Sequence, residues 1–443
     1  MDRRLFMKLG GLASAASVLP KVSFANSGTS GGRLKVALVG CGGRGTEAMQ
    51  NALMRDGNIQ IVALGDLFKD KVEKADASLR AFVESGGDGY RWKHDTKTFP
   101  KDTYAVTPET LFDGFDCCEK VCQTNCDVVM LVAPPFFRPA HLEICINAGK
   151  NIFAEKPMFV DVTQGRRVLE LAKIADEKNI KIVTGFQRRY AEPHIECIKR
   201  IQDGQIGDIT AAYCYWNNGG YVGGQSWSNE YKPDDMYYQL RNWQSWVWAS
   251  GDHVVEQHCH CLDILRWAFG DDNDPIDVTG FGGRSSLLPY PALGDRYSHF
   301  SNDFEYKNNA HLFSFCNQEP KASTNLTQRV LGTKGTCFID GGGYKIEGEK
   351  PWNFSGRSTE PCETEHEILL NAVRNNTKLN TLKSSANSTM MAVAARMSAF
   401  SAQKIKYDWI LKRSAENLAP ETMALDAKNP VRPLPLPGVY QLS

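Results

Sequence analysis

The stretch KVALVGCGGRGTEAMQ, residues 35–50, constrains the fold of this chain more than any other. An apolar run rich in β-branched residues predicts a buried parallel strand, and helical spacing follows through Ala48, Met49 and Leu53. Between strand and helix lies G-x-G-x-x-G, and a second apolar run, IQIVALGD, ends in an acidic residue about 20 residues later. This order of elements, namely strand, glycine turn, helix, strand and acidic residue, predicts a doubly wound parallel sheet that binds a dinucleotide.

Each glycine of this fingerprint has a physical role. Gly40 permits the tight turn, Gly42 lets the backbone approach a pyrophosphate, and Gly45 allows close packing of helix on strand. The helix start, at Gly43 and Arg44, offers free N–H groups and a partial positive charge to phosphates. The alternative is a glycine turn in an α/β domain that binds no nucleotide.

The acid that ends the second strand, Asp66, bears on the choice of nucleotide. Its carboxylate can accept hydrogen bonds from the adenosine ribose and would repel a 2′-phosphate, so NAD is favoured over NADP. Arg44 keeps NADP possible, because its guanidinium could instead meet that phosphate.

Later apolar runs continue the alternation of strand and helix. The stretches CDVVMLVAPP, NIFAEKP and IKIVTGFQRRY predict strands, and HLEICINAGK and QGRRVLELAKIADEKN predict the helices between them. Ligands of such a sheet bind beyond the carboxyl ends of its strands. The candidate cofactor contacts there are Asp66, Pro135, His141, Glu155, Lys156 and Gln187.

Two further stretches carry residues suited to acid–base chemistry. Lys156 follows a predicted strand, where its charge would stabilise an alkoxide; the alternative is an exposed lysine before a proline turn. Glu256, His260, Asp263 and Trp267 have helical spacing and would share one face of a helix. A carboxylate four residues before a histidine could orient its imidazole, so His260 could take a hydroxyl proton.

The cysteines and histidines do not predict a metal site or a disulfide framework, although the chain has thirteen cysteines. Residues 258–261, HCHC, are consecutive and cannot all point at one ion. Cys118, Cys122 and Cys126 could lie along one helical face, but they run directly into a strand. These cysteines are therefore expected to pack in the core as small polarisable side chains.

The N-terminus has the features of an export signal. Arg3 and Arg4 precede a weak apolar run, and Ser23 and Ala25 are small residues of a cleavage site. Paired arginines indicate the twin-arginine route, which carries folded proteins to the periplasm; a frayed basic terminus is the alternative. A protein folded before export would carry its nicotinamide tightly bound and keep its thiols reduced.

The net charge and the hydropathy of the chain argue against several classes of binding partner. Lys+Arg and Asp+Glu are both 51, so the formal net charge is zero, which argues against nucleic acid or an anionic membrane as partner. No run of 18 apolar residues follows residue 30, so no membrane span is expected after signal removal. A small-molecule substrate is the partner expected.

From Ala191 onward the strand–helix alternation ends. The stretches DITAAYCYWNN, HFSNDFEY, AHLFSFCNQ and STNLTQRVLGTKGTCFID predict strands of an antiparallel or mixed sheet, with helices over 365–375 and 385–403. The expected organisation is a signal peptide (1–25), a nucleotide-binding domain (34–188), an α+β substrate and oligomerisation domain (189–412) and an extended tail (413–443).

Together these stretches resemble the Gfo/Idh/MocA oxidoreductase family. VALVGCGGRG, LVAPPFFRPAH, IFAEKPM, TGFQRRY, VVEQHCHCLDILRW and LGTKGTCFID follow the family's order and approximate spacing. The resemblance implies a Rossmann domain, then an α+β domain with a large open, mostly antiparallel sheet. It also implies NAD or NADP and sugar or cyclitol substrates. An open sheet invites homo-oligomerisation through that face.

The resemblance also implies roles for single residues. Lys156 matches the family's active-site lysine and His260 its catalytic histidine, while Glu256 stands where the commonest pattern has Asp. Substrate contacts are expected at Arg189, Tyr190, Arg241 and Trp243.

Three activities remain open at this point. The first is an NAD(P)-dependent oxidoreductase acting on a sugar or cyclitol. The second is a glycosidase that cleaves through transient C3 oxidation and elimination. The E-K-P motif is not kept in such glycosidases but is present here at residues 155–157, so the oxidoreductase is favoured. The third is a non-catalytic sugar- or nucleotide-binding protein.

Overall fold

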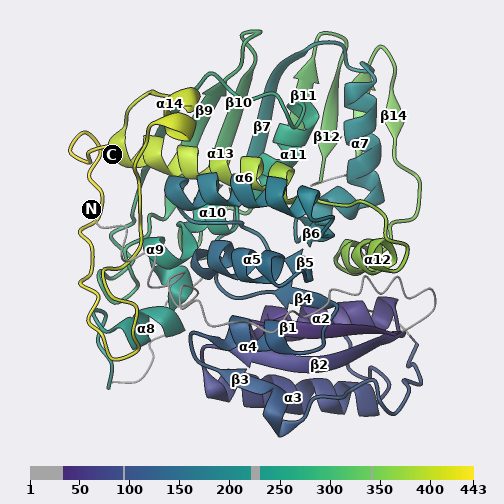
Figure 1. Ribbon diagram of the computed structural model, residues 1–443. Helices are drawn as coiled ribbons and strands as arrows, with labels where there is room; N and C mark the ends of the chain where they lie inside the picture. Colours follow the sequence, from purple (N-terminus) through teal and green to yellow (C-terminus); the bar gives the residue numbers. More distant parts are fainter. Residues whose placement is uncertain (1–32, 93–94, 221–229, 341–342) are drawn as a thin grey trace.

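Figure 1 shows the chain as a computed structural model, which describes residues 33–92, 95–220, 230–340 and 343–443. Two sheets form its framework, with helices packed between and around them (Figure 1). The expected signal peptide, residues 1–25, lies outside the described residues. No helix of the described part is long and apolar enough to cross a membrane.

The first sheet has six parallel strands in the order β3-β2-β1-β4-β5-β6, which confirms the expected Rossmann topology. The order reverses between β1 and β4, where ligands of such sheets bind. Its elements are β1 (Leu34–Val39), α2 (Gly43–Arg55), β2 (Ile59–Asp66), α3 (Lys69–Glu84), β3 (Leu111–Asp113), α4 (Cys117–Gln123), β4 (Val128–Leu131), α5 (Arg138–Asn147), β5 (Asn151–Ala154), α6 (Val162–Glu177) and β6 (Ile182–Thr184).

Two details of this sheet differ from the expectation. β3 was not predicted, because a strand of three residues carries too little apolar periodicity. β4 ends at Leu131, before the two prolines that were expected to close it. Pro135 instead begins the short 3₁₀ helix η3 (Pro135–Phe137), since its ring fixes φ and removes the N–H that a ladder needs.

The second sheet is open, has nine strands, and runs in the order β14-β13-β12-β11-β7-β10-β9-β8-β15. Every neighbouring pair is antiparallel except β7 and β10, which confirms a mostly antiparallel sheet. Its strands are β7 (Ile209–Asn217), β8 (Asp277–Gly283), β9 (His299–Glu305), β10 (His311–Asn317), β11 (Gln328–Gly332), β12 (Gly335–Ile339), β13 (Lys345–Gly348), β14 (Trp352–Asn353) and β15 (Ile405–Lys406).

Helices join the two sheets. α13 (Leu382–Ser401) packs against both α6 and β8 (Figure 1). Nearly all of its side chains are buried. α12 (Pro361–Arg374) lies beside α2 and so contributes a wall to the cofactor side. The remaining helices are α7 (Glu192–Gln202), α8 (Met236–Arg241), α9 (Val247–Ser250), α10 (His253–Glu256), α11 (Cys259–Phe269) and α14 (Tyr407–Lys412), with 3₁₀ turns η2 (Pro108–Thr110), η4 (Gln187–Tyr190) and η5 (Trp243–Ser245).

The C-terminal segment, residues 413–443, contains neither helix nor strand. Backbone hydrogen bonds hold it to the second domain: Met236 N donates to Ala427 O at 3.0 Å, and Gly438 N to Ser401 O at 3.1 Å. Its prolines have no N–H and so cannot donate to a ladder.

Candidate active site

The glycine turn is packed so closely that two of its positions admit no side chain. Gly40 has φ +101°, and a Cβ there would stand 2.3 Å from Ala133 N. A Cβ on Gly45 would stand 1.9 Å from Gly40 O. Gly42 and Gly43 face open space, so the backbone there is accessible to a ligand. The structure thus gives each glycine a position consistent with its expected role.

The start of α2 suits a pyrophosphate. No side chain caps it, and no acidic residue lies in its first turn. Its first N–H groups therefore have no carboxylate competing with a phosphate, and the dipole favours negative charge. These residues fit the pyrophosphate of NAD.

We expect Gly45→Ala to lower both the melting temperature and NAD affinity. The added methyl would overlap Gly40 O, and such overpacking costs about 1–3 kcal/mol or more. Gly42→Ala is the matched control: it should keep the melting temperature of the ligand-free protein but weaken NAD binding, because only the ligand meets its methyl group. Thermal unfolding and NAD titration measure both effects. Equal melting temperatures for the two variants would contradict the packing argument.

Asp66 lies at the end of β2 and braces the turn. Its Oδ2 accepts from Cys41 N at 2.7 Å and its Oδ1 from Phe68 N at 2.9 Å. Burial raises the pKa of this carboxyl, while the two backbone N–H groups act in the opposite direction. The side chain is only partly buried, so its outer lone pairs are available to a ribose.

Arg44 is tied to the protein by two carboxylates. Its Nε donates to Glu155 Oε1 at 2.6 Å, and its Nη2 lies 3.4 Å from Glu365 Oε1 on α12. Burial opposes its charge, but Glu155 and Glu365 outweigh burial and raise the pKa of the guanidinium. An arginine paired in this way is less available to a 2′-phosphate, which supports the preference for NAD.

Lys156 reaches across the domain boundary to Glu256. Its Nζ donates to Glu256 O at 2.6 Å and to Glu256 Oε1 at 3.1 Å. Burial alone lowers the pKa of this lysine, but the negative charge of Glu256 outweighs burial and the net pKa is raised. The lysine is therefore a fixed positive charge at neutral pH.

His260 is buried in the first turn of α11, between aromatic rings. Phe186 meets it edge-on at 5.8 Å, and Trp216 stacks on it at 5.9 Å between ring centroids. Burial, followed by the positive charge of Lys156, lowers the pKa of the imidazole well below its usual value. The ring is thus neutral at neutral pH, the form that accepts a proton.

The expected continuous helix around these residues is wrong. α10 ends at Glu256, and α11 begins only at Cys259. The Glu256 carboxylate contacts Lys156, and His260 Nδ1 has no hydrogen-bond partner among the described residues. Glu256 therefore positions the lysine rather than orienting the imidazole.

Lys156, Glu256 and His260 open onto one cavity of about 620 Å³. Of the predicted site residues it is lined by Arg44, Pro135, Glu155, Lys156, Gln187, Trp243, Glu256 and His260. The cavity lies between the carboxyl edge of the parallel sheet and the second domain, so the lysine from one domain and the histidine from the other meet there.

Three expected substrate contacts lie outside this lining. Arg189 is held by Asp263 at 2.9 Å and by Asp271 at 2.7 Å. Arg241 pairs with Asp70, and its guanidinium covers the Phe68 ring beside β2. Tyr190 packs partly buried against the first domain's core, and His141 is buried within α5.

The cavity also includes residues that the sequence did not single out: Trp92, Arg188, His194, Gln244 and Tyr344. Arg188 is largely buried, stacks over Trp216 at 5.5 Å and lies 3.3 Å from Asp340. It adjoins Arg189 in the RRY run, and only the turn of η4 decides which arginine faces the cavity.

Comparison with known proteins independently supports an NAD-binding first domain. Residues 34–181 match the model of the GFO_IDH_MocA family, described as an oxidoreductase family with an NAD-binding Rossmann fold. The inositol 2-dehydrogenase of Pseudomonas fluorescens is 26% identical over 248 residues, which are 55% of this chain and 57% of that protein. The chain thus spans about half the length of the curated relatives it matches.

Solved structures match over most of the chain. Scyllo-inositol dehydrogenase from Lactobacillus casei, with bound NAD(H) and scyllo-inositol, has a TM-score of 0.60 at 17% identity, covering 85% of this chain and 99% of that one. An aldose–aldose oxidoreductase from Caulobacter crescentus, complexed with glycerol, has a TM-score of 0.62 at 14% identity, covering 84% and 99%. At these identities the likeness shows the shared two-sheet fold. Residues 34–181 therefore match an oxidoreductase family with an NAD-binding Rossmann fold, and the solved structures extend the likeness in fold to most of the chain.

Proposed function

We propose that this protein is an NAD-dependent oxidoreductase that moves a hydride between a CH–OH carbon of a cyclitol or sugar and the nicotinamide. The observation that carries this proposal is the pairing of a neutral histidine and a charged lysine on one cavity. His260 and Lys156 both line it, whereas the glycines of the turn and Asp66 lie outside its lining, at the carboxyl ends of β1 and β2.

In this mechanism NAD, when bound, supplies the hydride acceptor. His260 takes the hydroxyl proton of the substrate, since its imidazole is neutral and buried. Lys156 stabilises the developing alkoxide, and Glu256 holds the ammonium group toward the cavity at 3.1 Å. The rings of Phe186 and Trp216 keep water away from the imidazole.

The substrate class rests on two lines of support. Relatives with similar sequences are named inositol 2-dehydrogenases, and structural neighbours include a scyllo-inositol dehydrogenase and an aldose–aldose oxidoreductase. The cavity also places Trp92, Trp243 and Tyr344 beside arginines and glutamates. Aromatic faces meet the C–H groups of a sugar ring while charged groups meet its hydroxyls.

The test has two arms. Protein purified without added cofactor is denatured, and released nucleotide is identified by mass spectrometry; we expect NAD in near-stoichiometric amount. Native protein is then mixed with a panel of inositols and aldoses while nicotinamide absorbance is followed. Reduction by one of them supports the proposal. Release of aglycone from an aryl glycoside without net reduction would favour a redox glycosidase, and no nucleotide binding at all would leave a non-catalytic binding protein.

We also propose that the open face of the second sheet forms a homo-oligomer interface. Alternate residues of β7 and β10 stand half-exposed there, with Tyr213 stacked on Phe313 at 5.1 Å and Tyr215 on Phe315 at 5.3 Å. Phe281 on β8 is 60% exposed. A row of aromatic side chains on a sheet face is typical of a protein interface. Light scattering that gives a monomer mass would refute this.

A tightly held cofactor and export to the periplasm by the twin-arginine route remain part of this proposal. Cofactor loaded during cytoplasmic folding would have to recycle in place, as in a reaction that oxidises one sugar and reduces another. The mass-spectrometry arm therefore tests this as well. Fractionation of cells that express the full chain, with and without the Arg3–Arg4 pair, tests the route.

A further inference from the structure

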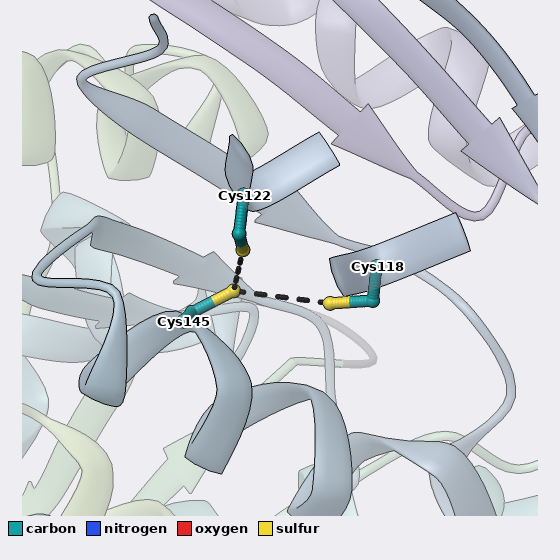
Figure 2. Close-up of side chains that lie close together, drawn as sticks. All are labelled: Cys118, Cys122 and Cys145. Carbon is teal, nitrogen blue, oxygen red and sulfur yellow. Dashed lines mark hydrogen bonds between the residues drawn. The ribbon is translucent and has the colours of Figure 1, made fainter. Parts of the chain in front are cut away.

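Three cysteine side chains from two helices meet in the core of the first domain. Cys118 and Cys122 lie one turn apart on α4, and Cys145 faces them from α5 (Figure 2). The Cys145 Sγ atom is 3.5 Å from Cys122 Sγ and 4.0 Å from Cys118 Sγ. All three sulfur atoms lie within 4.8 Å of one another, and all three residues are buried.

These separations match those of sulfurs that share one metal ion. Four tetrahedral ligands at a Zn–S distance of about 2.3 Å stand about 3.8 Å apart. The two measured distances lie on either side of that value. The pairing C-x₃-C on one helix and a third thiol on a neighbouring helix also lets all three side chains converge, which consecutive residues cannot do.

We propose that Cys118, Cys122 and Cys145 bind a thiophilic d¹⁰ cation, Zn²⁺ or Cu⁺, which ties α4 to α5. Buried thiolates are the ligands that select such ions. Binding replaces the thiol protons, which are released to solvent, so no oxidant or reductant is needed. Zn²⁺ is favoured, because it neutralises two of the three thiolate charges in a site from which water is excluded.

A positive charge lies just beyond α4. The Lys150 ammonium group donates to Cys126 O at 2.9 Å and to Thr124 O at 3.1 Å. Its charge would offset part of the negative charge of a thiolate cluster.

The position suggests a structural role. A Cβ on Gly65 would meet Cys117 and Val121 of α4, so this helix packs directly on the strand that ends at Asp66. An ion that fixes α4 would also fix the ribose end of the dinucleotide site. We expect the ion to raise the melting temperature and leave the chemical step unchanged.

The full chain is purified without chelator under reducing conditions and analysed for metals. About one equivalent of zinc is expected, and copper as the bound metal would identify Cu⁺ instead. Cys122→Ser should lose at least nine-tenths of the metal. Cys126→Ser is the matched control, because Cys126 lies beyond the end of α4 and outside the cluster, and it should keep the metal.

A second measurement does not depend on the variants folding. Metal-edge X-ray absorption of the unaltered protein counts sulfur neighbours, and three are expected at about 2.3 Å. Unaltered protein that takes up no Zn²⁺ or Cu⁺ after incubation would overturn the proposal. So would a bound metal with fewer than two sulfur neighbours, or equal metal content in Cys122→Ser and unaltered protein.

Discussion

His260→Ala is expected to lower kcat for alcohol oxidation by about 10²–10⁴-fold while NAD affinity stays unchanged. The reason is that this buried, neutral imidazole lines the cavity and has no hydrogen-bond partner for Nδ1 among the described residues. Steady-state kinetics on the preferred inositol or aldose and NAD titration measure the two quantities. His299→Ala, on the exposed part of β9, is the control and should keep full turnover.

The pH profile distinguishes a base from a packing residue. Because burial and Lys156 lower the pKa of His260, the neutral form persists as pH falls through the ordinary histidine value of about 6.5. In the oxidation direction kcat/KM should therefore hold through pH 6.5 and fall only at more acidic pH. In His260→Ala the decrease of kcat/KM at acidic pH should disappear, and added imidazole should restore part of the rate. Unchanged turnover in the variant would remove His260 from the mechanism.

Lys156→Met is expected to reduce kcat by about 10²–10³-fold, because it removes the charge that stabilises the alkoxide. It should also lower the melting temperature, since the Glu256 carboxylate loses its partner at 3.1 Å within a site of low exposure. Kinetics and thermal unfolding of the same preparation measure both losses.

A double variant separates the two roles of this lysine. In Lys156→Met with Glu256→Gln no unpaired buried charge remains, so the melting temperature should recover while kcat stays low. Lys69→Met, at an exposed position on α3, is the control and should match the unaltered protein in both assays. Recovery of turnover in the double variant would show that the lysine serves only to hold Glu256.

The features read correctly from the sequence are those that depend on local backbone. Gly40 and Gly45 stand where a Cβ would overlap backbone atoms, and Asp66 ends the second strand, as the spacing predicts. Lys156 was located in the same way, since a residue after a parallel strand lies at the ligand edge of the sheet. The two-sheet architecture followed from where the strand–helix alternation stops.

The features that were missed depend on contacts between distant segments. Arg188 and Arg189 are neighbours, and only the phase of a 3₁₀ turn sends one to the cavity and the other to Asp263. Helical spacing predicts that the Glu256 carboxylate orients His260, but the helix breaks after α10 and the carboxylate contacts Lys156 instead. Cys145 was not linked with Cys118 and Cys122, because nothing in their spacing reveals that α4 faces α5.

The sequence by itself determined the dinucleotide turn, its acid, the strand-end lysine and the order of the two sheets, because hydrogen-bond periodicity and glycine conformation are properties of neighbouring residues. Only the tertiary structure decided which charges pair, which arginine lines the cavity and which thiols meet. Those outcomes depend on packing between elements far apart in the chain, where burial and charge pairing act together and local spacing carries no information.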